Sequence, residues 1–195
     1  IFAALTISKS LPKNIGTVIV KHANPCGVSI KKNNLESYQS AFACDPVSAF
    51  GGIVSCNFKI TKSVALELSK IFLEVVIANN FDSNALNILK KKKNLRLIDA
   101  SNYSVNEGQK YISANNEVLI QSEDIKKFTT KDFKIVSKRK PSLKEMKNLI
   151  FAFNVCKYVK SNAIVIAANE TTAGIGSGQP SRLDSCKIAI EKMKK

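Results

Sequence analysis

The chain of 195 residues has few of the residues that build metal sites and disulfide frameworks. It has one histidine, His22, no tryptophan and five cysteines without a C-x-x-C pair. A zinc site needs about four Cys, His or carboxylate ligands at short spacings, so the sequence predicts no metal site. An odd number of scattered cysteines argues against a disulfide framework and indicates a reducing, cytoplasmic setting.

Long apolar runs are also missing. No run approaches the roughly 20 residues of a membrane-spanning helix, so we expect a soluble protein. The opening "IFAALTIS" has no basic leader and does not resemble a signal peptide. The chain begins with Ile1, so we expect a segment of a longer chain. A hydrophobic content of 45% with 23% charged residues is typical of a globular protein of one or two domains.

Arginine is scarce although the chain is strongly basic. The net charge is +15, from 30 Lys and Arg against 15 Asp and Glu, and only Arg96, Arg139 and Arg182 are arginines. A basic surface can bind nucleic acid, but proteins that grip phosphates in a bidentate manner are usually richer in Arg. We therefore favour the compositional drift of an AT-rich genome over nucleic-acid binding. Anionic small substrates would also be compatible with the charge.

Short β-branched runs alternate with helix-period segments, which is typical of an α/β layer fold. We expect "NPCG" (24–27) to be a tight turn, because it combines a proline with a glycine. Ser142 and Glu145 form a capping-box pattern at the start of the clearest helix. The stretch 101–116 has no clear period and is expected to be a surface excursion. Strands are expected at 16–20, 49–57, 74–78, 95–99, 117–121 and 163–168, and helices at 35–44, 61–72, 83–93 and 142–159.

Glycines alternate in "AGIGSGQPSRLDS" (173–185), where Gly174, Gly176 and Gly178 form G-x-G-x-G. We expect a strand-to-helix turn here. A glycine-rich turn before a helix can present backbone N–H groups to an anion, although the plainer interpretation is a tight turn without a ligand. Arg182 near the start of the following helix favours an anionic group at this place.

His22 has two interpretations, a satisfied structural ring or a working acid/base group. Lys21 favours the second, because a neighbouring positive charge disfavours the imidazolium form. Adjacent strand residues point to opposite faces, so both can serve one pocket only if the chain leaves regular strand geometry here.

Three further positions also have a plain alternative. Gly51 would let a ligand approach the backbone, or it marks a bulge; Phe50 precedes it. Glu74 could be an ordinary exposed carboxylate, and Asn162 a turn residue.

Six stretches carry a resemblance to a known family. They are "VIVKHANPCGVS", "CDPVSAFGGIVSCN", "FLEVVIA", "IVSKRKP", "KYVKSNAIVIAAN" and "GIGSGQPSRLDS". Their order and approximate spacing resemble those of bacterial AICAR transformylase. This is the formyltransferase part of a bifunctional purine-biosynthesis enzyme that also carries IMP cyclohydrolase. The resemblance covers nearly the whole chain.

The resemblance implies transfer of a formyl group from 10-formyltetrahydrofolate, as cosubstrate, to AICAR, without a catalytic metal. It assigns His22 as the general base, Lys21 as the assisting cation and Asn162 as the residue that orients the substrate. Poor aromatic amines need such a base, and the developing oxyanion needs a positive donor. Gly51, Glu74 and Ser161 fall on the substrate side. Phe50, Gly51 and Arg182 fall near the folate.

The family also implies a three-layer α/β/α fold that resembles cytidine deaminases and is used twice. Residues 1–125 would be the first unit, and 126–195 a helical connection with the beginning of the second. The deaminase H-x-E signature is absent, since Ala23 and Asn24 follow His22. The resemblance implies a homodimer with sites at the interface.

Several family segments are missing, among them the upstream "RYGxNPxQ"-type and the C-terminal "SDAFFPFRD" motifs. Asn79 and Asn80 also stand where a proline commonly follows "IA". We therefore expect the central part of a transformylase, without its cyclohydrolase domain. The alternatives are a basic nucleic-acid-binding domain and an inactive fragment of the enzyme.

Overall fold

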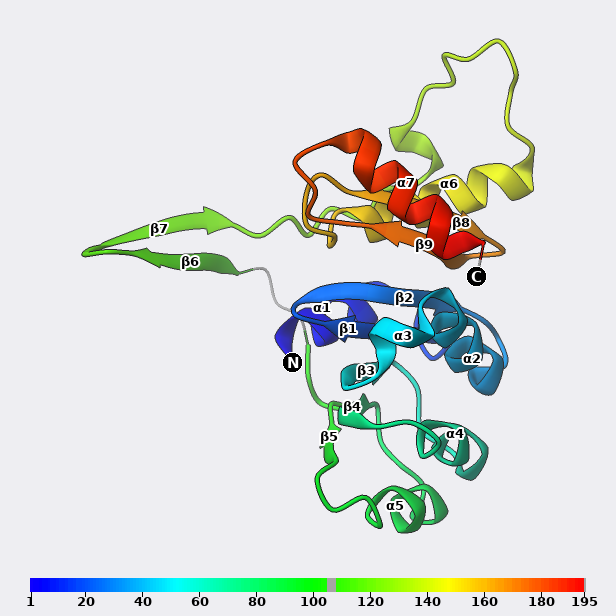
Figure 1. Ribbon diagram of the computed structural model, residues 1–195, viewed down its shortest axis with the longest axis vertical. Coiled ribbons are helices and arrows are strands. Elements are labelled where there is room, and N and C mark those ends of the chain that lie inside the picture. The colour runs from blue at the N-terminus through cyan, green and yellow to red at the C-terminus, as the bar shows by residue number, and fades with distance from the viewer. Residues whose placement is uncertain (105–107, 195) are drawn as a thin grey trace.

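One mixed seven-stranded sheet with helices on both faces forms the body of the molecule (Figure 1). The computed structural model describes residues 1–104 and 108–194. The strand order is β5-β4-β3-β1-β2-β9-β8. The strands are β1 (Gly16–Lys21), β2 (Asn24–Ile30), β3 (Gly52–Cys56), β4 (Leu73–Ala78), β5 (Arg96–Asp99), β8 (Ile164–Ala168) and β9 (Thr171–Gly176).

The helices complete the predicted three-layer α/β/α architecture, which is confirmed. On one face lie α2 (Asn34–Cys44), α4 (Lys62–Leu68), α5 (Ser83–Leu89) and α7 (Arg182–Met193). The other face is covered by α1 (Phe2–Ser10) and α6 (Leu143–Cys156), and the short α3 (Pro46–Ala49) follows α2. Buried apolar side chains fill both interfaces between helices and sheet, so strands such as β1 are apolar on both faces. Among the described residues, no helix is long and apolar enough to cross a membrane.

Strand directions gather many chain segments at one end of the sheet. β3, β4 and β5 run parallel to one another, and all other neighbours in the sheet are antiparallel. The ends of β1 and β9 and the starts of β2, β3, β4, β5 and β8 therefore share one edge. We call this the site edge, formed by residues 21–24, 50–52, 72–74, 96, 160–163 and 176–182.

The turn between β1 and β2 differs from the prediction. "NPCG" is not a turn: Asn24 to Gly27 belong to β2, and Pro25 lies opposite Val20 beside a bulge in the β1–β2 pairing. The turn is made by His22 and Ala23, with φ of 51° and 61°. Proline cannot donate to the ladder, and a bulge is one of the few places where a sheet accepts it. His22 thus leaves strand geometry. This is the condition under which Lys21 and His22 can face the same pocket.

The G-x-G-x-G segment also differs from the prediction, because two of its glycines lie within β9 rather than in a turn. A Cβ on Gly174 would lie 2.0 Å from the Ala189 carbonyl oxygen, and one on Gly176 would lie 1.8 Å from that of Ser185. Only Gly178, with φ of 69°, is in the turn. These alternate glycines let the backbone of α7 approach the sheet closely.

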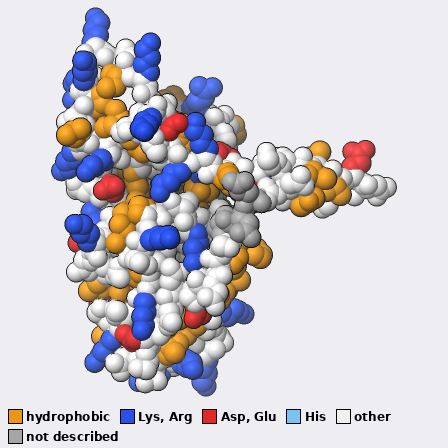
Figure 2. Space-filling model, turned by 180° about the vertical axis from the view of Figure 1, so that it is seen from behind, with side chains coloured by type: hydrophobic (Ala, Val, Ile, Leu, Met, Phe, Trp, Pro, Cys, Tyr) orange, Lys and Arg blue, Asp and Glu red, His pale blue; other side chains and the backbone are white. Residues whose placement is uncertain are grey.

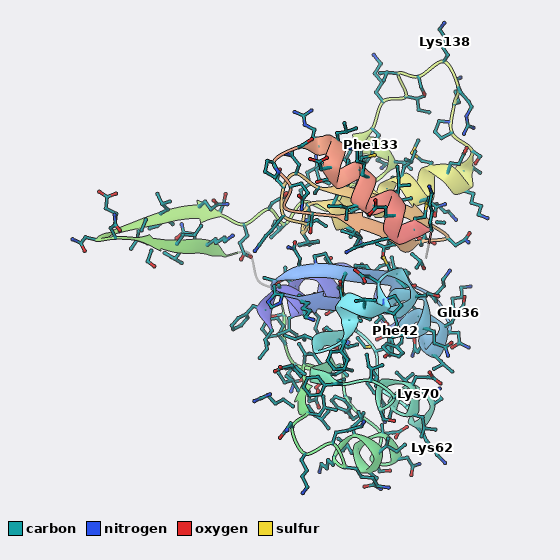
Figure 3. All side chains as sticks on the ribbon, in the orientation of Figure 1. Glu36, Phe42, Lys62, Lys70, Phe133 and Lys138 are labelled. Carbon is teal, nitrogen blue, oxygen red and sulfur yellow. The ribbon has the colours of Figure 1, made fainter. Side chains whose placement is uncertain are left out.

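Between β5 and α6 the chain leaves the layers. The predicted strand at 117–121 is confirmed as β7 (Glu117–Ser122), and it pairs with β6 (Gln109–Ala114) in an exposed hairpin that projects from the body (Figure 1). β6 falls within the stretch predicted as a surface excursion, of which residues 105–107 lie outside the described residues. A 3₁₀ turn (Thr130–Asp132) and a loop through Phe133 and Lys138, labelled in Figure 3, lead to α6.

The predicted capping box at the start of α6 is confirmed. The Ser142 hydroxyl accepts a hydrogen bond from the Glu145 N–H at 3.2 Å, and the Glu145 carboxylate accepts one from the Ser142 N–H at 2.8 Å. Both bonds use N–H groups that a helix start leaves unpaired, so the box fixes where α6 begins.

We predict that Gly176→Ala lowers the free energy of unfolding by roughly 3 kcal/mol, because the new methyl group would overlap a helix carbonyl. Gly178→Ala is the matched control: nothing lies within 4 Å of its Cβ position, so only the left-handed backbone costs energy, about 1 kcal/mol. Urea unfolding monitored by circular dichroism measures both. Equal losses of unfolding free energy in the two variants would show that the close approach of α7 does not require glycine at position 176.

Candidate active site

A pocket of about 850 Å³ opens at the site edge beside the start of α1. Five of the eight predicted site residues line it: Lys21, His22, Phe50, Gly51 and Glu74. They come from the ends of β1, β3 and β4, which are far apart in sequence and adjacent in the sheet. The strand order therefore gathers side chains that the sequence keeps apart.

Two hydrogen bonds hold the Phe50–Gly51 loop in the pocket wall. The Lys21 ammonium donates to the Phe50 carbonyl oxygen at 2.7 Å. The Gly51 N–H donates to the Phe72 carbonyl oxygen at 2.9 Å, and Gly51 has a φ of 70° that favours glycine. The rings of Phe50 and Phe72 also contact each other, with centroids 5.5 Å apart. The loop and Lys21 are thus one connected unit.

His22 is exposed at the tip of the β1–β2 turn. Within the described part of the chain, its imidazole makes no hydrogen bond or ion pair. This does not fit the interpretation as a satisfied structural ring, because such a ring would be buried and partnered. Both ring nitrogens are open to a molecule in the pocket.

Glu74 lies at the pocket opposite an arginine that the sequence prediction missed. The Arg96 Nη1 atom is 3.7 Å from the Glu74 Oε2 atom, and both side chains are more than half exposed. Glu74 is on β4 and Arg96 begins the neighbouring β5. No local motif marks Arg96; only the parallel pairing of these two strands brings it to the pocket.

Ser161, Asn162 and Arg182 lie on the same edge of the sheet but do not line this pocket. The Asn162 side-chain NH₂ donates to the carbonyl oxygens of Gln179 and Pro180 at 2.9 and 2.8 Å. Ser161 and Arg182 are exposed, and Arg182 is the first residue of α7. This group is the Asn162 cluster, formed by residues 160–162 and 177–182.

One contact joins the Asn162 cluster to the histidine turn. The Lys160 N–H donates to the Asn24 side-chain oxygen at 2.9 Å, and Asn24 is two residues after His22. The Lys160 carbonyl oxygen accepts from the Gly178 N–H at 2.8 Å. The cluster therefore sits beside the turn, separated from the pocket by the start of β2.

Asp45 positions the loop that carries Phe50. Its side chain is 8% exposed, accepts from the Ser48 N–H at 3.0 Å to begin α3, and forms an ion pair of 2.6 Å with Lys192 of α7. Burial alone would raise the pKa of Asp45. The Lys192 ammonium and the Ser48 donors outweigh burial, so the pKa lies below its usual value.

Three buried cysteine thiols close to the sheet are expected to be unreactive. Burial raises the pKa of Cys26 and Cys56 to about 12 and that of Cys44 to about 11. Thiols with such pKa values carry almost no thiolate near neutral pH and are poor nucleophiles. In the described ranges, no group of three or more His, Cys, Asp or Glu residues could hold a metal ion. The ionisable side chains that line the pocket are thus Lys21, His22, Glu74 and Arg96.

This arrangement defines an α/β protein with a pocket lined by ionisable side chains at the end of buried strands. Comparison with known families places it more closely: the model of the AICARFT/IMPCHase bienzyme family matches residues 1–192. The chain belongs to this family, and the family predicted from its six motifs is confirmed.

Curated relatives agree in their name, "Bifunctional purine biosynthesis protein PurH". The chain is 47% identical to the protein of Parvibaculum lavamentivorans over 176 residues, which cover 89% of this chain and 33% of that protein. It is 44% identical to that of Persephonella marina over 192 residues, 97% of this chain and 37% of that protein. It is 44% identical to the Bacillus cereus protein over 189 residues, which cover 96% of this chain and 37% of that protein. The chain thus spans about a third of the length of these relatives.

We predict that the Asp45 carboxylate makes stability depend on pH. Its folded pKa is depressed, so its contribution is fully present above the unfolded value of about 4 and is lost as pH falls through the folded pKa. Asp45→Asn should lower the free energy of unfolding by roughly 2 kcal/mol at pH 7, with the difference shrinking toward pH 3. Denaturant unfolding at each pH measures this.

The control for this measurement is Asp184→Asn, which removes the same charge from an exposed position of α7. We expect a change below about 0.5 kcal/mol at all pH values. A loss at Asp45 that is independent of pH would contradict the role of its charge.

Proposed function

We propose that the protein to which this chain belongs transfers a formyl group from 10-formyltetrahydrofolate to AICAR, giving FAICAR and tetrahydrofolate. The observation that carries the proposal is the joint lining of one pocket by Lys21, His22, Phe50, Gly51 and Glu74. Membership of the bienzyme family and the purine-biosynthesis relatives support it. The cosubstrate, rather than a metal ion, supplies the group that is transferred.

His22 is the proposed general base. The amine of AICAR is conjugated to a ring that carries a carboxamide, so it is a poor nucleophile until its proton is removed. The free imidazole at the mouth of the pocket accepts that proton as the amine attacks the formyl carbon. Lys21 has one N–H engaged by the Phe50 carbonyl, and its two other donors can stabilise the oxyanion that develops.

The remaining residues bind the two substrates in this proposal. Gly51, Glu74 and Ser161 contact AICAR, and Asn162 orients it for attack. Phe50 and Gly51 contact the folate, together with Arg182. The loop geometry supports a double role of Gly51, because its N–H is held by Phe72 and its missing side chain leaves the backbone accessible.

The Asn162 cluster lies outside the pocket, and we propose that a second copy of the chain completes the site. Each active site would then form at the interface of a homodimer. We also propose a cytoplasmic protein that carries IMP cyclohydrolase activity in another domain. In this proposal residues 1–125 form one α/β unit and 126–195 lead into a second, although β8 and β9 extend the sheet of the first.

Nucleic-acid binding remains the weaker alternative. It rests on the net charge of +15. In the view of Figure 2, Lys and Arg side chains are spread over the surface with apolar patches between them, and they do not follow one stripe. A nucleic-acid interface usually concentrates its basic residues on one face.

The test of the proposed base is His22→Asn in the full-length protein. Asparagine accepts the positive φ of this turn, so the variant removes the imidazole and keeps the backbone. We predict that the rate of formyl transfer falls about 10²- to 10⁴-fold. The change in folate absorbance measures this rate. The control Asn14→Ala changes an exposed residue with φ of 66° away from the pocket and should keep full activity. Near-normal turnover in His22→Asn would rule out the general base.

A further inference from the structure

Arg96 is placed in the pocket by the strand order and has no assigned role. It begins β5, pairs with Val75 of β4 and lines the same pocket as His22. It is also one of only three arginines among 30 basic residues. At a site where lysine would supply the same charge, arginine adds a planar fork of donors that matches carboxylate and phosphate groups.

The guanidinium of Arg96 is largely unengaged. Its contact with Glu74 at 3.7 Å is the only ion pair or hydrogen bond that it makes within residues 1–104 and 108–194. A guanidinium has five N–H donors, and this one is 67% exposed. Most of its hydrogen-bonding capacity is therefore open to the pocket.

Glu74 directs this guanidinium without neutralising it tightly. A bidentate pair would bring two N–H groups to about 2.8 Å from the carboxylate oxygens, and the observed contact is much longer. The carboxylate attracts Arg96 toward the pocket and leaves its fork free to bind another anion. A ligand can thus join the pair without first breaking a strong bond.

The backbone segments that carry Arg96 and His22 are well separated in the sheet. β1 and β5 are separated by β3 and β4, and three strand spacings amount to about 14 Å. A molecule with its reacting atom at His22 would reach Arg96 only with a distant part. That part must be negatively charged to gain from a guanidinium.

We propose that Arg96 is a substrate-binding residue that holds a phosphate or carboxylate group at the end of the pocket opposite His22. The inference rests on the proposed function, whose two substrates both carry such groups. AICAR ribonucleotide has a 5′-phosphate, and the folate has the carboxylates of its glutamate. Arg96 thereby favours the charged form of one substrate over an uncharged analogue.

The experiment measures dissociation constants by titration calorimetry on the full-length protein and its variants. Arg96→Gln should weaken binding of one substrate about tenfold or more, because charge-assisted hydrogen bonds are lost. Arg96→Lys should recover part of that loss through its charge. The control Arg139→Gln removes an exposed arginine paired with Glu145, far from the pocket, and should bind as the wild type does.

Analogues without the charge identify the group that Arg96 holds. If it binds the phosphate, Arg96→Gln and the wild type should bind AICA riboside equally. If it binds the glutamate, the two should bind the N-methylamide of 10-formyltetrahydropteroic acid equally, because this analogue has no carboxylate. The kcat of Arg96→Gln should stay within twofold of the wild type at saturating substrate, since Arg96 does not touch the reacting atoms.

Two results would overturn the inference separately from the proposed function. A wild type that binds and turns over both substrates while Arg96→Gln binds them as Arg139→Gln does would remove only the role of Arg96. Tenfold weakening that persists with both uncharged analogues would show a structural effect and equally remove it. A wild type that binds neither substrate would overturn the inference and the proposed function together.

Discussion

Between β2 and β9 the sheet is joined by hydroxyl groups more than by backbone. The ladder there is a single residue pair, Ser29 with Thr171, whose hydroxyls lie 2.7 Å apart. The Thr172 hydroxyl accepts from the Val28 N–H at 2.9 Å and donates to the Val28 carbonyl oxygen at 3.2 Å. Thr172 is 1% exposed, so water cannot replace these bonds without opening the sheet. At this seam the sheet continues from β2 into β9 and β8.

The seam also decides which residues can meet at the site edge. Because β9 runs antiparallel to β2, its end returns toward the histidine turn, and β8 begins there as well. The alternate glycines of β9 let α7 lie close enough for Lys192 to reach Asp45, which starts the helix before Phe50. The pocket loop and the Asn162 cluster are thus tied through both the sheet and a helix. A parallel seam would have placed Asn162 at the opposite end of the sheet.

Hydrophobic periodicity predicted most strands of the sheet and most helices packed on it. Burial on both faces leaves continuous apolar runs in β1 and β4, which made these strands easy to recognise. Local turn chemistry was less reliable. Pro25 and Gly27 predicted a turn, but pairing of β2 with both of its neighbours outweighs the preference of two residues. Gly174 and Gly176 are two residues apart, which is the period of a strand, but this segment was predicted to be a turn. Arg96 could not be found locally, since its place depends on the order of strands.

The hydrogen bonds at the site edge separate groups that hold the fold from groups free to bind. Both N–H groups of the Asn162 amide are used by the carbonyls of Gln179 and Pro180. Its side-chain oxygen makes no hydrogen bond to the described residues, so Asn162 can only accept from a ligand. A carboxamide N–H is such a donor, and the proposed substrate AICAR carries one. By the same reasoning His22 offers two unpartnered ring nitrogens and Arg96 offers donors only, so these three groups of the edge differ in the hydrogen bonds that they can form.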